Sequence, residues 1–518
     1  MLKSSGAMAI ATMMSRLLGM VRVILYARFM GDSPVFGAFS LAFTIPNLFR
    51  RLLGEGALSA AFVPIFKETE TKDGESAMWR VANVVISWLV KISLIIVITV
   101  LIGLTIALTS PGLSAKARLV LELVRVMFPF MLMACLAAIF MGILNSRGKF
   151  FLPALSPILL NLILIPTVLF IAPRWGVKLD EQVFALAYAV VIAGAVQVIY
   201  MIPALRKEGF RFQWIKPSGD PVISRLWSRM LPGLFGVAAF QINVFLTGIM
   251  AAGIDLEINA SYEYAVRLFE LPQGLFGVSL ATFLLPTLAG LAAEEKTTEF
   301  KATLTQGLGY IIFVNALMGG LLLILSEPMV RLLFERGRFD ADSTLRAASA
   351  LKWLGLALVP YSVNSILARA FFALGDFKTP MRISAACLGL NLFVLCLLIG
   401  TFRQEGLAIA NLITTSLNTI LLVIALRRKI GNIGLRKMIA MLIQVFCALT
   451  ISLAIGWFLH GWWDHRFGNA TLWLRIGEVF VPITLTCLSY LLFAFSLKMP
   501  VARELVTLVT RRLRKKSD

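Results

Sequence analysis

The sequence has 518 residues, of which 59% are hydrophobic and 15% are charged, and Lys and Arg outnumber Asp and Glu by 49 to 28. Soluble globular proteins average about 45–50% apolar and about 25% charged residues, so this composition excludes an ordinary soluble protein and indicates a membrane protein. The net charge of +21 does not indicate nucleic-acid binding, because no hydrophilic stretch is long enough to form a separate binding domain.

The apolar segments predict an all-α polytopic membrane protein with fourteen transmembrane helices. A spanning helix needs about 20 mostly apolar residues. Two N-terminal segments, 5–31 and 35–66, have this length but are interrupted by charges. The charge-free windows that follow are 92–115, 126–146, 150–173, 182–205, 230–254, 271–293, 302–326, 353–368, 383–402, 406–426, 438–463 and 479–497.

Basic residues in the loops predict the orientation of the chain. With the N-terminus in the cytoplasm, 28 of the 49 basic residues lie on the cytoplasmic side and eleven lie outside. Cytoplasmic loops carry an excess of Lys and Arg, so both termini are expected in the cytoplasm. The tail ending in Arg511–Lys516 suits contact with anionic head groups. The remaining ten basic residues lie in or at the edges of the spans.

An internal repeat predicts two halves of the same orientation. Gly148–Pro153 recurs 227 residues later as Gly375–Pro380, and each copy is followed by Leu-Asn-Leu, at 160–162 and 390–392. Six spans separate equivalent points, so two parallel six-helix lobes are expected around a central cavity, as in transporters that work by alternating access. The predicted division is an N-lobe (1–210), a C-lobe (211–430), two additional helices (431–498) and a basic cytoplasmic tail (499–518).

Charges within the first two spans are candidates for substrate contacts, since an ionisable residue near the bilayer centre costs at least about 2.5–3.5 kcal/mol. Helical geometry points the three arginines of the first span 120° apart. The outermost of them can extend to the interface, whereas the deeper two favour a cavity. In the second span a polar face follows Pro46, with Glu55 as a partial partner for Arg51. The candidates are Arg16, Arg22, Arg28, Asn47, Arg50, Arg51 and Glu55.

The eighth span carries a charged stripe of Glu263, Arg267 and Glu270. These residues share one helix face, so the two glutamates can orient the arginine toward a substrate. A purely structural ion triad between helices is the alternative. Arg369 follows Ser365 by four residues and is a supporting candidate.

The sign of the charges in the spans predicts an anionic substrate. Against ten basic residues the spans offer few acids, and the planar guanidinium group suits phosphate or pyrophosphate. The five cysteines lie in apolar runs without metal-ligand or disulfide spacing. Nucleophile motifs and phosphate loops are also missing, so the sequence indicates a transporter without a cofactor and not an enzyme.

Three motifs resemble the MurJ (MviN) lipid II flippases of the multidrug/oligosaccharidyl-lipid/polysaccharide exporter superfamily. They are Ser15-Arg16-Leu17-Leu18-Gly19 with Arg22, Pro46-Asn47-Leu48-Phe49-Arg50-Arg51 continuing to Pro64, and Arg267-Leu268 with Glu270, Pro272 and Gly274. The resemblance covers essentially the whole chain. It implies a cationic cavity for the pyrophosphate and sugar-peptide head of undecaprenyl-linked lipid II, and a groove for the lipid tail formed by the last two spans.

Further expectations follow from the resemblance. Ser15, Arg16, Arg22, Arg50 and Arg267 would contact the head group. The expected location is the bacterial cytoplasmic (inner) membrane, with lipid II and membrane lipids as partners, no nucleic acid, cell-wall synthesis proteins as candidate partners, and a monomeric state. Coupling to the membrane potential or to an unidentified ion is expected. The family commonly has acids at the places of Val23, Gly37 and Val266, and spans seven, eleven and twelve contain no Asp or Glu, which argues against a carboxylate sodium site there.

Three alternatives stay open at this point. A flippase for another undecaprenyl-pyrophosphate-linked oligosaccharide would share the lipid anchor and the cationic cavity. A multidrug antiporter would need cavity acids, which the sign of the charges disfavours. A membrane scaffold for cell-wall enzymes would not need arginines within the spans.

Overall fold

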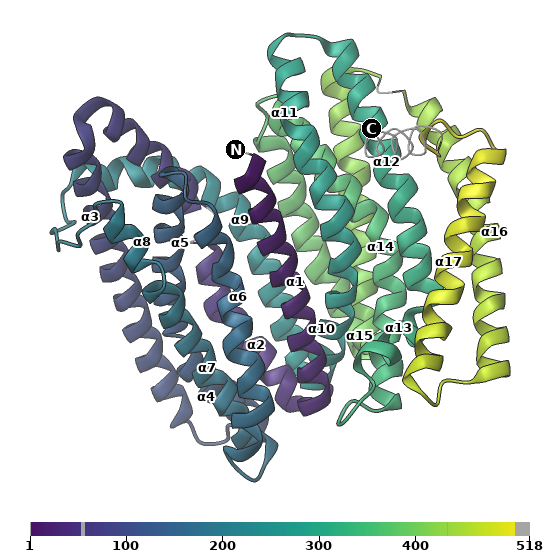
Figure 1. Ribbon diagram of the computed structural model, residues 1–518, viewed down its shortest axis with the longest axis horizontal. Helices are drawn as coiled ribbons and strands as arrows, with labels where there is room; N and C mark the ends of the chain where they lie inside the picture. Colours follow the sequence, from purple (N-terminus) through teal and green to yellow (C-terminus); the bar gives the residue numbers. More distant parts are fainter. Residues whose placement is uncertain (1, 53–56, 433, 503–518) are drawn as a thin grey trace. The chain divides into compact units, whose positions relative to one another are not determined.

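The computed structural model describes residues 2–52, 57–432 and 434–502, and the regular structure in these ranges is helical (Figure 1). The helices pack into two compact units. The first contains the described residues up to Ala260 together with Arg336–Phe339, and the second contains Ser261–Glu335 and the described residues from Asp340 onward. The segment Arg336–Phe339 belongs to the first unit because the Arg338 N–H donates to the Arg28 carbonyl oxygen at 3.1 Å.

The helices of the first unit run from the N-terminus to the end of α9. Their bounds are α1 Leu2–Met30, α2 Pro34–Phe49, α3 Ala57–Leu108, α4 Ala115–Met127, α5 Phe130–Ser146, α6 Phe151–Pro166, η2 Thr167–Ile171, η3 Ala172–Arg174, α7 Leu179–Ile199, α8 Ile202–Lys207 and α9 Pro221–Ile254. Helix α1 packs on α6, and α9 packs on α2 and α3. The sequence places α9 in the second lobe, and the assignment of 1–210 and 211–430 to two lobes stays a prediction.

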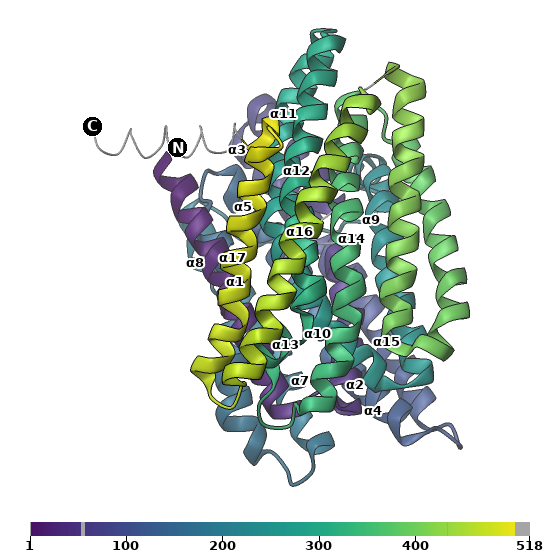
Figure 2. The ribbon, with the colours of Figure 1, turned by 90° about the vertical axis from the view of Figure 1, so that its right-hand side faces the viewer.

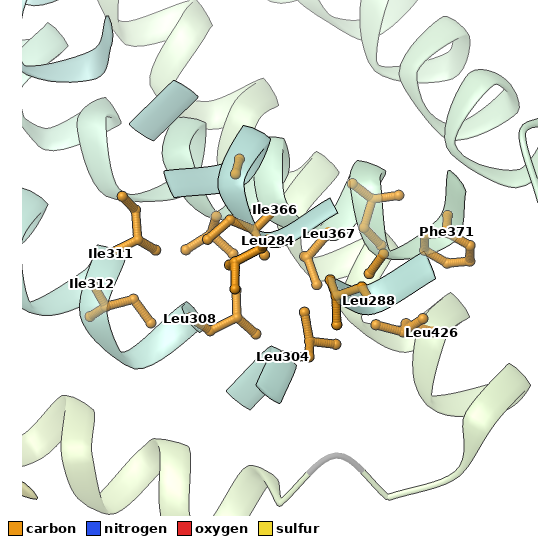
Figure 3. Close-up of a cluster of buried hydrophobic side chains, with 14 of the residues drawn as sticks. Leu284, Leu288, Leu304, Leu308, Ile311, Ile312, Ile366, Leu367, Phe371 and Leu426 are labelled. Carbon is orange, nitrogen blue, oxygen red and sulfur yellow. The ribbon is translucent and has the colours of Figure 1, made fainter. Parts of the chain in front are cut away.

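The second unit begins within α10 and ends with a helical hairpin. The bounds are α10 Leu256–Pro272, η4 Gln273–Val278, α11 Ser279–Ala293, α12 Thr297–Ile324, α13 Ser326–Phe334, α14 Ala341–Ala373, α15 Lys378–Ile430, α16 Leu435–Phe467 and α17 Leu472–Ser496. Its core lies where α11, α12, α14 and α15 meet, around Leu284, Leu308, Leu367 and Leu426 (Figure 3).

The helices confirm the predicted class of all-α membrane protein. Nine helical segments of the described chain are long and apolar enough to span a bilayer, or ten if α4 and α5, bent by 40°, form one span. The predicted count of fourteen is consistent with this result. Helix α15 covers two predicted spans and is broken at Arg403, where φ is 47°.

The surface of α3 shows why these helices belong in lipid. Ile95, Ile98, Ile102 and Ile106 recur on one face and are each about half exposed or more, with exposed fractions from 48% to 65%. A continuous apolar stripe of this kind is rare on the surface of soluble monomers. Because hydrocarbon solvates such side chains, the stripe marks a face that contacts lipid.

The two copies of the repeated motif close the same turn in their separate units. Gly148 and Gly375 adopt φ values of 76° and 72°, which a residue with a side chain rarely adopts. The N–H of the following residue donates to a carbonyl five residues earlier, Lys149 to Leu144 and Asp376 to Phe371, at 2.9 Å in each copy. The repeated sequence therefore encodes the same helix-ending turn twice.

Asp376 connects this second turn to the end of α15. Its carboxylate accepts a hydrogen bond from Lys429 Nζ at 2.7 Å and caps the Thr379 N–H at 3.0 Å. The interaction with Lys429, followed by the hydrogen bonds from Thr379, lowers the pKa of the Asp376 carboxyl from 3.8 to about 2. The folded protein therefore favours the charged form of this group.

Changing Asp376 to asparagine is expected to lower thermal stability at pH 7 by about 1 kcal/mol or less, because asparagine keeps the cap but loses the ion pair. A depressed pKa stabilises the fold above the ordinary value and ceases to do so as the pH falls from 3.8 toward about 2. In thermal unfolding of the detergent-solubilised protein, the midpoints of the Asp376→Asn variant and the unmodified protein should differ at pH 7 and coincide near pH 2. In a Lys429→Met background the substitution should have a smaller effect at pH 7, because only the hydrogen bonds from Thr379 then favour the carboxylate over the amide. An equal loss in that background would show that Lys429 is not the partner that matters.

Candidate functional site

Helix α1 carries the first three candidate arginines and is held in the first unit by α6. The Asn161 side chain of α6 donates from Nδ2 to the Ser15 carbonyl oxygen at 3.3 Å. Arg16 and Arg28 are exposed, whereas Arg22 is half-buried. The Arg22 guanidinium carbon lies 5.7 Å from the centre of the Tyr26 ring, within the range of a cation–π interaction. The three arginines therefore have different surroundings along one helix.

Helix α2 is followed by a π-helical turn at residues 50–52, which contains the two adjacent arginines. Arg50 Nε donates to Asn47 Oδ1 at 2.7 Å, within the same helix end. Arg51 Nη1 donates to Gln241 Oε1 of α9 at 3.3 Å. Arg50 is thus oriented by a residue of the same helix end, and Arg51 by a different helix. Both of these partners are neutral amides, so neither hydrogen bond neutralises the positive charge of the arginine. Glu55, the predicted partner of Arg51, lies outside the described residues.

Helix α10 carries the predicted charged stripe in the second unit. Arg267 Nη1 donates to Glu270 Oε2 at 2.9 Å, and Arg267 Nη2 donates to Glu263 Oε1. The exposed fractions of the Arg267, Glu263 and Glu270 side chains are 37%, 26% and 47%. The predicted geometry of the stripe is confirmed. Both interpretations of it, a substrate-binding arginine and a structural triad, are compatible with these contacts.

Arg369 of α14 makes contacts that connect two helices of the second unit. Its Nη1 donates to the Ser365 carbonyl oxygen at 3.3 Å, and its Nη2 donates to Thr282 Oγ1 of α11 at 3.1 Å. The Arg369 side chain is half-buried. These hydrogen bonds fit the supporting role that the sequence assigns to Arg369.

Sequence reasoning missed several partners of the candidate residues. Gln241, which was not among the candidates, is the partner of Arg51. Tyr26 was not selected, although its position four residues after Arg22 was a usable signal, because residues i and i+4 are neighbours on a helix. The contact of Arg51 with Gln241 bridges 190 residues, and a single sequence gives no signal for it.

A family model described as "Lipid II flippase MurJ" matches residues 26–476. The chain belongs to the MurJ lipid II flippase family. A "Lipid II flippase MurJ" from Burkholderia cenocepacia is 33% identical over 431 residues, which cover 81% of this chain and 82% of the relative. A "Probable lipid II flippase MurJ" from Rhizobium tropici is 30% identical over 494 residues, covering 94% and 92%.

Solved structures agree with this family at the level of the fold. A structure of "Lipid II flippase MurJ, inward closed conformation" has a TM-score of 0.78 and 23% sequence identity, and covers 96% of this chain and 99% of the solved one. An inward-facing multidrug resistance MATE family transporter has a TM-score of 0.66 with 15% identity over 82% of this chain. The arrangement of helices is therefore shared with transporters that carry other substrates.

The three positions at which the resemblance to the MurJ family led us to expect acids differ in their surroundings. Val23 is buried and Val266 is half-buried. At Gly37 a Cβ atom would lie 2.0 Å from the Leu256 carbonyl oxygen, and the Gly37 carbonyl oxygen accepts a hydrogen bond from Asn259 Nδ2 at 3.2 Å. No side chain fits at residue 37, so this departure from the family pattern is built into the packing.

Proposed function

We propose that this chain moves lipid II, the undecaprenyl-pyrophosphate-linked peptidoglycan precursor, from the cytoplasmic to the periplasmic leaflet by alternating access. The observation that carries the proposal is the set of oriented arginines on helices of a MurJ family member. Arg50 is oriented by Asn47, and Arg267 by Glu263 and Glu270. The curated relatives that match most of the chain are named for lipid II flipping.

Arg16, Arg22, Arg50 and Arg267 are the proposed contacts of the pyrophosphate. A guanidinium group presents two parallel N–H donors that match phosphate oxygens, and such charge-assisted hydrogen bonds are about twice as strong as neutral ones. Ser15, Asn47, Arg51 and Glu270 would complete or orient these contacts. Arg28, Glu55, Glu263 and Arg369 would support the helices or gate the site.

The remaining parts of the proposal concern the membrane and the assembly. The excess of basic residues in the loops favours cytoplasmic positions for both termini in the bacterial inner membrane. We propose a monomer that can work beside cell-wall synthesis proteins, with no cofactor. The net positive charge of the spans fits coupling to the membrane potential or to an ion, because a charge that crosses the membrane field gains or loses about 2.3 kcal/mol per 100 mV.

Depletion of the native flippase in a cell that expresses this chain tests the proposal. The unmodified chain is expected to maintain periplasmic exposure of lipid II. A variant with Arg16, Arg22, Arg50 and Arg267 all changed to alanine is expected to lose it, because the pyrophosphate would enter the spans without its cationic contacts. Exposure is scored by accessibility of the lipid II head group at the outer surface, at equal protein levels.

A matched control removes the same charge from exposed arginines at helix ends and in a loop. Arg174, Arg206, Arg211 and Arg466 are all exposed, and their replacement by alanine should leave lipid II exposure intact. Normal exposure with all four candidate arginines replaced would overturn the assignment of the site. Failure of the unmodified chain on lipid II, with success on another undecaprenyl-pyrophosphate-linked oligosaccharide, would overturn the substrate.

A further inference from the structure

The hairpin of α16 and α17 packs against α12 and α13 within the second unit (Figure 2). Tyr490 of α17 stacks on Phe313 of α12 with ring centres 4.8 Å apart, and its hydroxyl donates to the Phe313 carbonyl oxygen at 3.1 Å. Toward the loop between α16 and α17, the contacts change from apolar to charged. The charged end of this interface takes no part in the proposed arginine site.

Glu478 of α17 is a fully buried carboxylate at this end, with an exposed fraction of 0%. Arg331 of α13 donates from Nη1 to Glu478 Oε1 at 2.9 Å, and its Nη2 donates to Glu327. The second carboxylate oxygen, Glu478 Oε2, is buried and has no hydrogen-bond partner among the described residues. A buried charged acceptor without a partner is costly, and protonation of the carboxylate lowers that cost.

His460 of α16 faces the same carboxylate. Its Nδ1 atom lies 3.8 Å from Glu478 Oε1, which is too far for a hydrogen bond. Nδ1 is also buried without a hydrogen-bond partner in the described part of the chain. Two titratable groups on neighbouring helices therefore face each other across a gap that one shared proton can close.

The charged groups around this pair have an excess of negative charge. Helix α13 contributes Glu327 and Arg331, with Glu335 just beyond its end, and α16 contributes Asp464. Arg475 of α17 donates to Glu335 at 3.0 Å. Helix α12 carries its charges, Glu299 and Lys301, at its opposite end. Four carboxylates, Glu478 included, thus stand against two guanidinium groups, which favours the binding of a proton.

We propose that His460 and Glu478 form a proton-binding site that controls how tightly α16 and α17 are joined beside α13. A proton taken from water binds the carboxylate or the imidazole, and in either case one N–H or O–H becomes available between Nδ1 and the carboxylate. The resulting hydrogen bond shortens the 3.8 Å separation to about 2.8 Å. Loss of the proton to water returns the pair to the open state.

Trp463 reports on the same junction. Its indole N–H donates to the Leu474 carbonyl oxygen of α17 at 3.2 Å. A Cβ atom at Gly477 would lie 2.0 Å from the Trp463 ring, so the ring rests directly on the backbone beside Glu478. Movement of α17 relative to α16 must therefore change the environment of this indole.

The chain has two histidines, which permits a direct measurement in the full-length protein. Histidine side chains labelled with 15N are titrated by NMR in phosphatidylglycerol/phosphatidylethanolamine nanodiscs, and His465→Gln assigns the two signals. The signal of the exposed His465 serves as the reference. His460 should titrate in two steps, because it shares its proton with Glu478. The 19F signal of fluorinated Trp463, assigned by Trp463→Phe, should move with the same midpoints.

Glu478→Gln is expected to reduce the His460 titration to one step, to shift its midpoint by about one pH unit and to abolish the movement of the Trp463 signal. Glu299→Gln, an exposed carboxylate at the far end of α12, should change neither. A single-step His460 titration in the otherwise unmodified protein overturns the proposal even if Glu478→Gln fails to fold. Because no transport is measured, this result is separate from success or failure of lipid II flipping.

Discussion

Replacement of Gly37 by alanine is expected to prevent accumulation of the folded protein. Gly37 lies in the first turn of α2, where the backbone of Leu256, the first residue of α10, approaches it directly. A Cβ atom would lie 2.0 Å from the Leu256 carbonyl oxygen and 2.8 Å from its carbonyl carbon. Both obstacles are backbone atoms, so no change of rotamer can relieve the clash, and we expect a loss of about 3 kcal/mol or more.

The measurement is the yield and thermal midpoint of the detergent-solubilised protein by size-exclusion chromatography. Gly253→Ala is the matched control, because Gly253 lies in α9 of the same unit and a Cβ atom there meets nothing within 4 Å. Alanine is the better helix former by about 1 kcal/mol, so this control should be neutral or stabilising. An unchanged midpoint for Gly37→Ala would mean that α2 and the start of α10 can separate without cost.

Neutralising the whole triad of α10 is expected to abolish lipid II exposure while the protein stays folded. In the variant Glu263→Gln, Arg267→Gln, Glu270→Gln, no carboxylate is left unpaired, so a structural ion triad would be replaced without a buried charge. A head-group contact would be lost, and hydrogen bonds to charged groups contribute about 1.5–3 kcal/mol, or about 10- to 150-fold in affinity. Exposure of lipid II under native-flippase depletion measures the effect.

Two further variants separate the alternatives. Arg267→Ala leaves Glu263 and Glu270 without their shared partner and should lose both stability and lipid II exposure. Glu263→Gln with Glu270→Gln keeps the arginine but removes the carboxylates that orient it, and should retain part of the lipid II exposure that the triple variant loses. Full lipid II exposure in the variant Glu263→Gln, Arg267→Gln, Glu270→Gln would show that the triad has only a structural role.

The positions of the helices were predictable because each apolar window is a local property of the sequence. The window 438–463 lies within α16, and the repeated glycines Gly148 and Gly375 end helices at equivalent points. The exact ends were less predictable. Asp340 caps α14 by accepting a hydrogen bond from the Ser343 N–H at 2.8 Å, so that helix begins well before its charge-free window at residue 353.

The contacts of the candidate site residues were only partly predictable, and their roles stay a prediction. The triad around Arg267 follows from i, i+3 and i, i+4 spacing on a single helix, and the structure confirms its geometry. The contact between Arg51 and Gln241 depends on two helices far apart in the chain. Glu478 and Arg331 are likewise 147 residues apart.

By itself the sequence determined the membrane class, the apolar segments, the family and which arginines are candidates for contacts with an anionic substrate, because hydrophobicity, helical spacing and charge are carried by neighbouring residues. Only the tertiary structure decided which partner each charge has and which residues have no room for a side chain. Gly37 and the pair of His460 with Glu478 show the reason. Close backbone approach and burial are created by contacts between helices, and no local pattern in the chain records them.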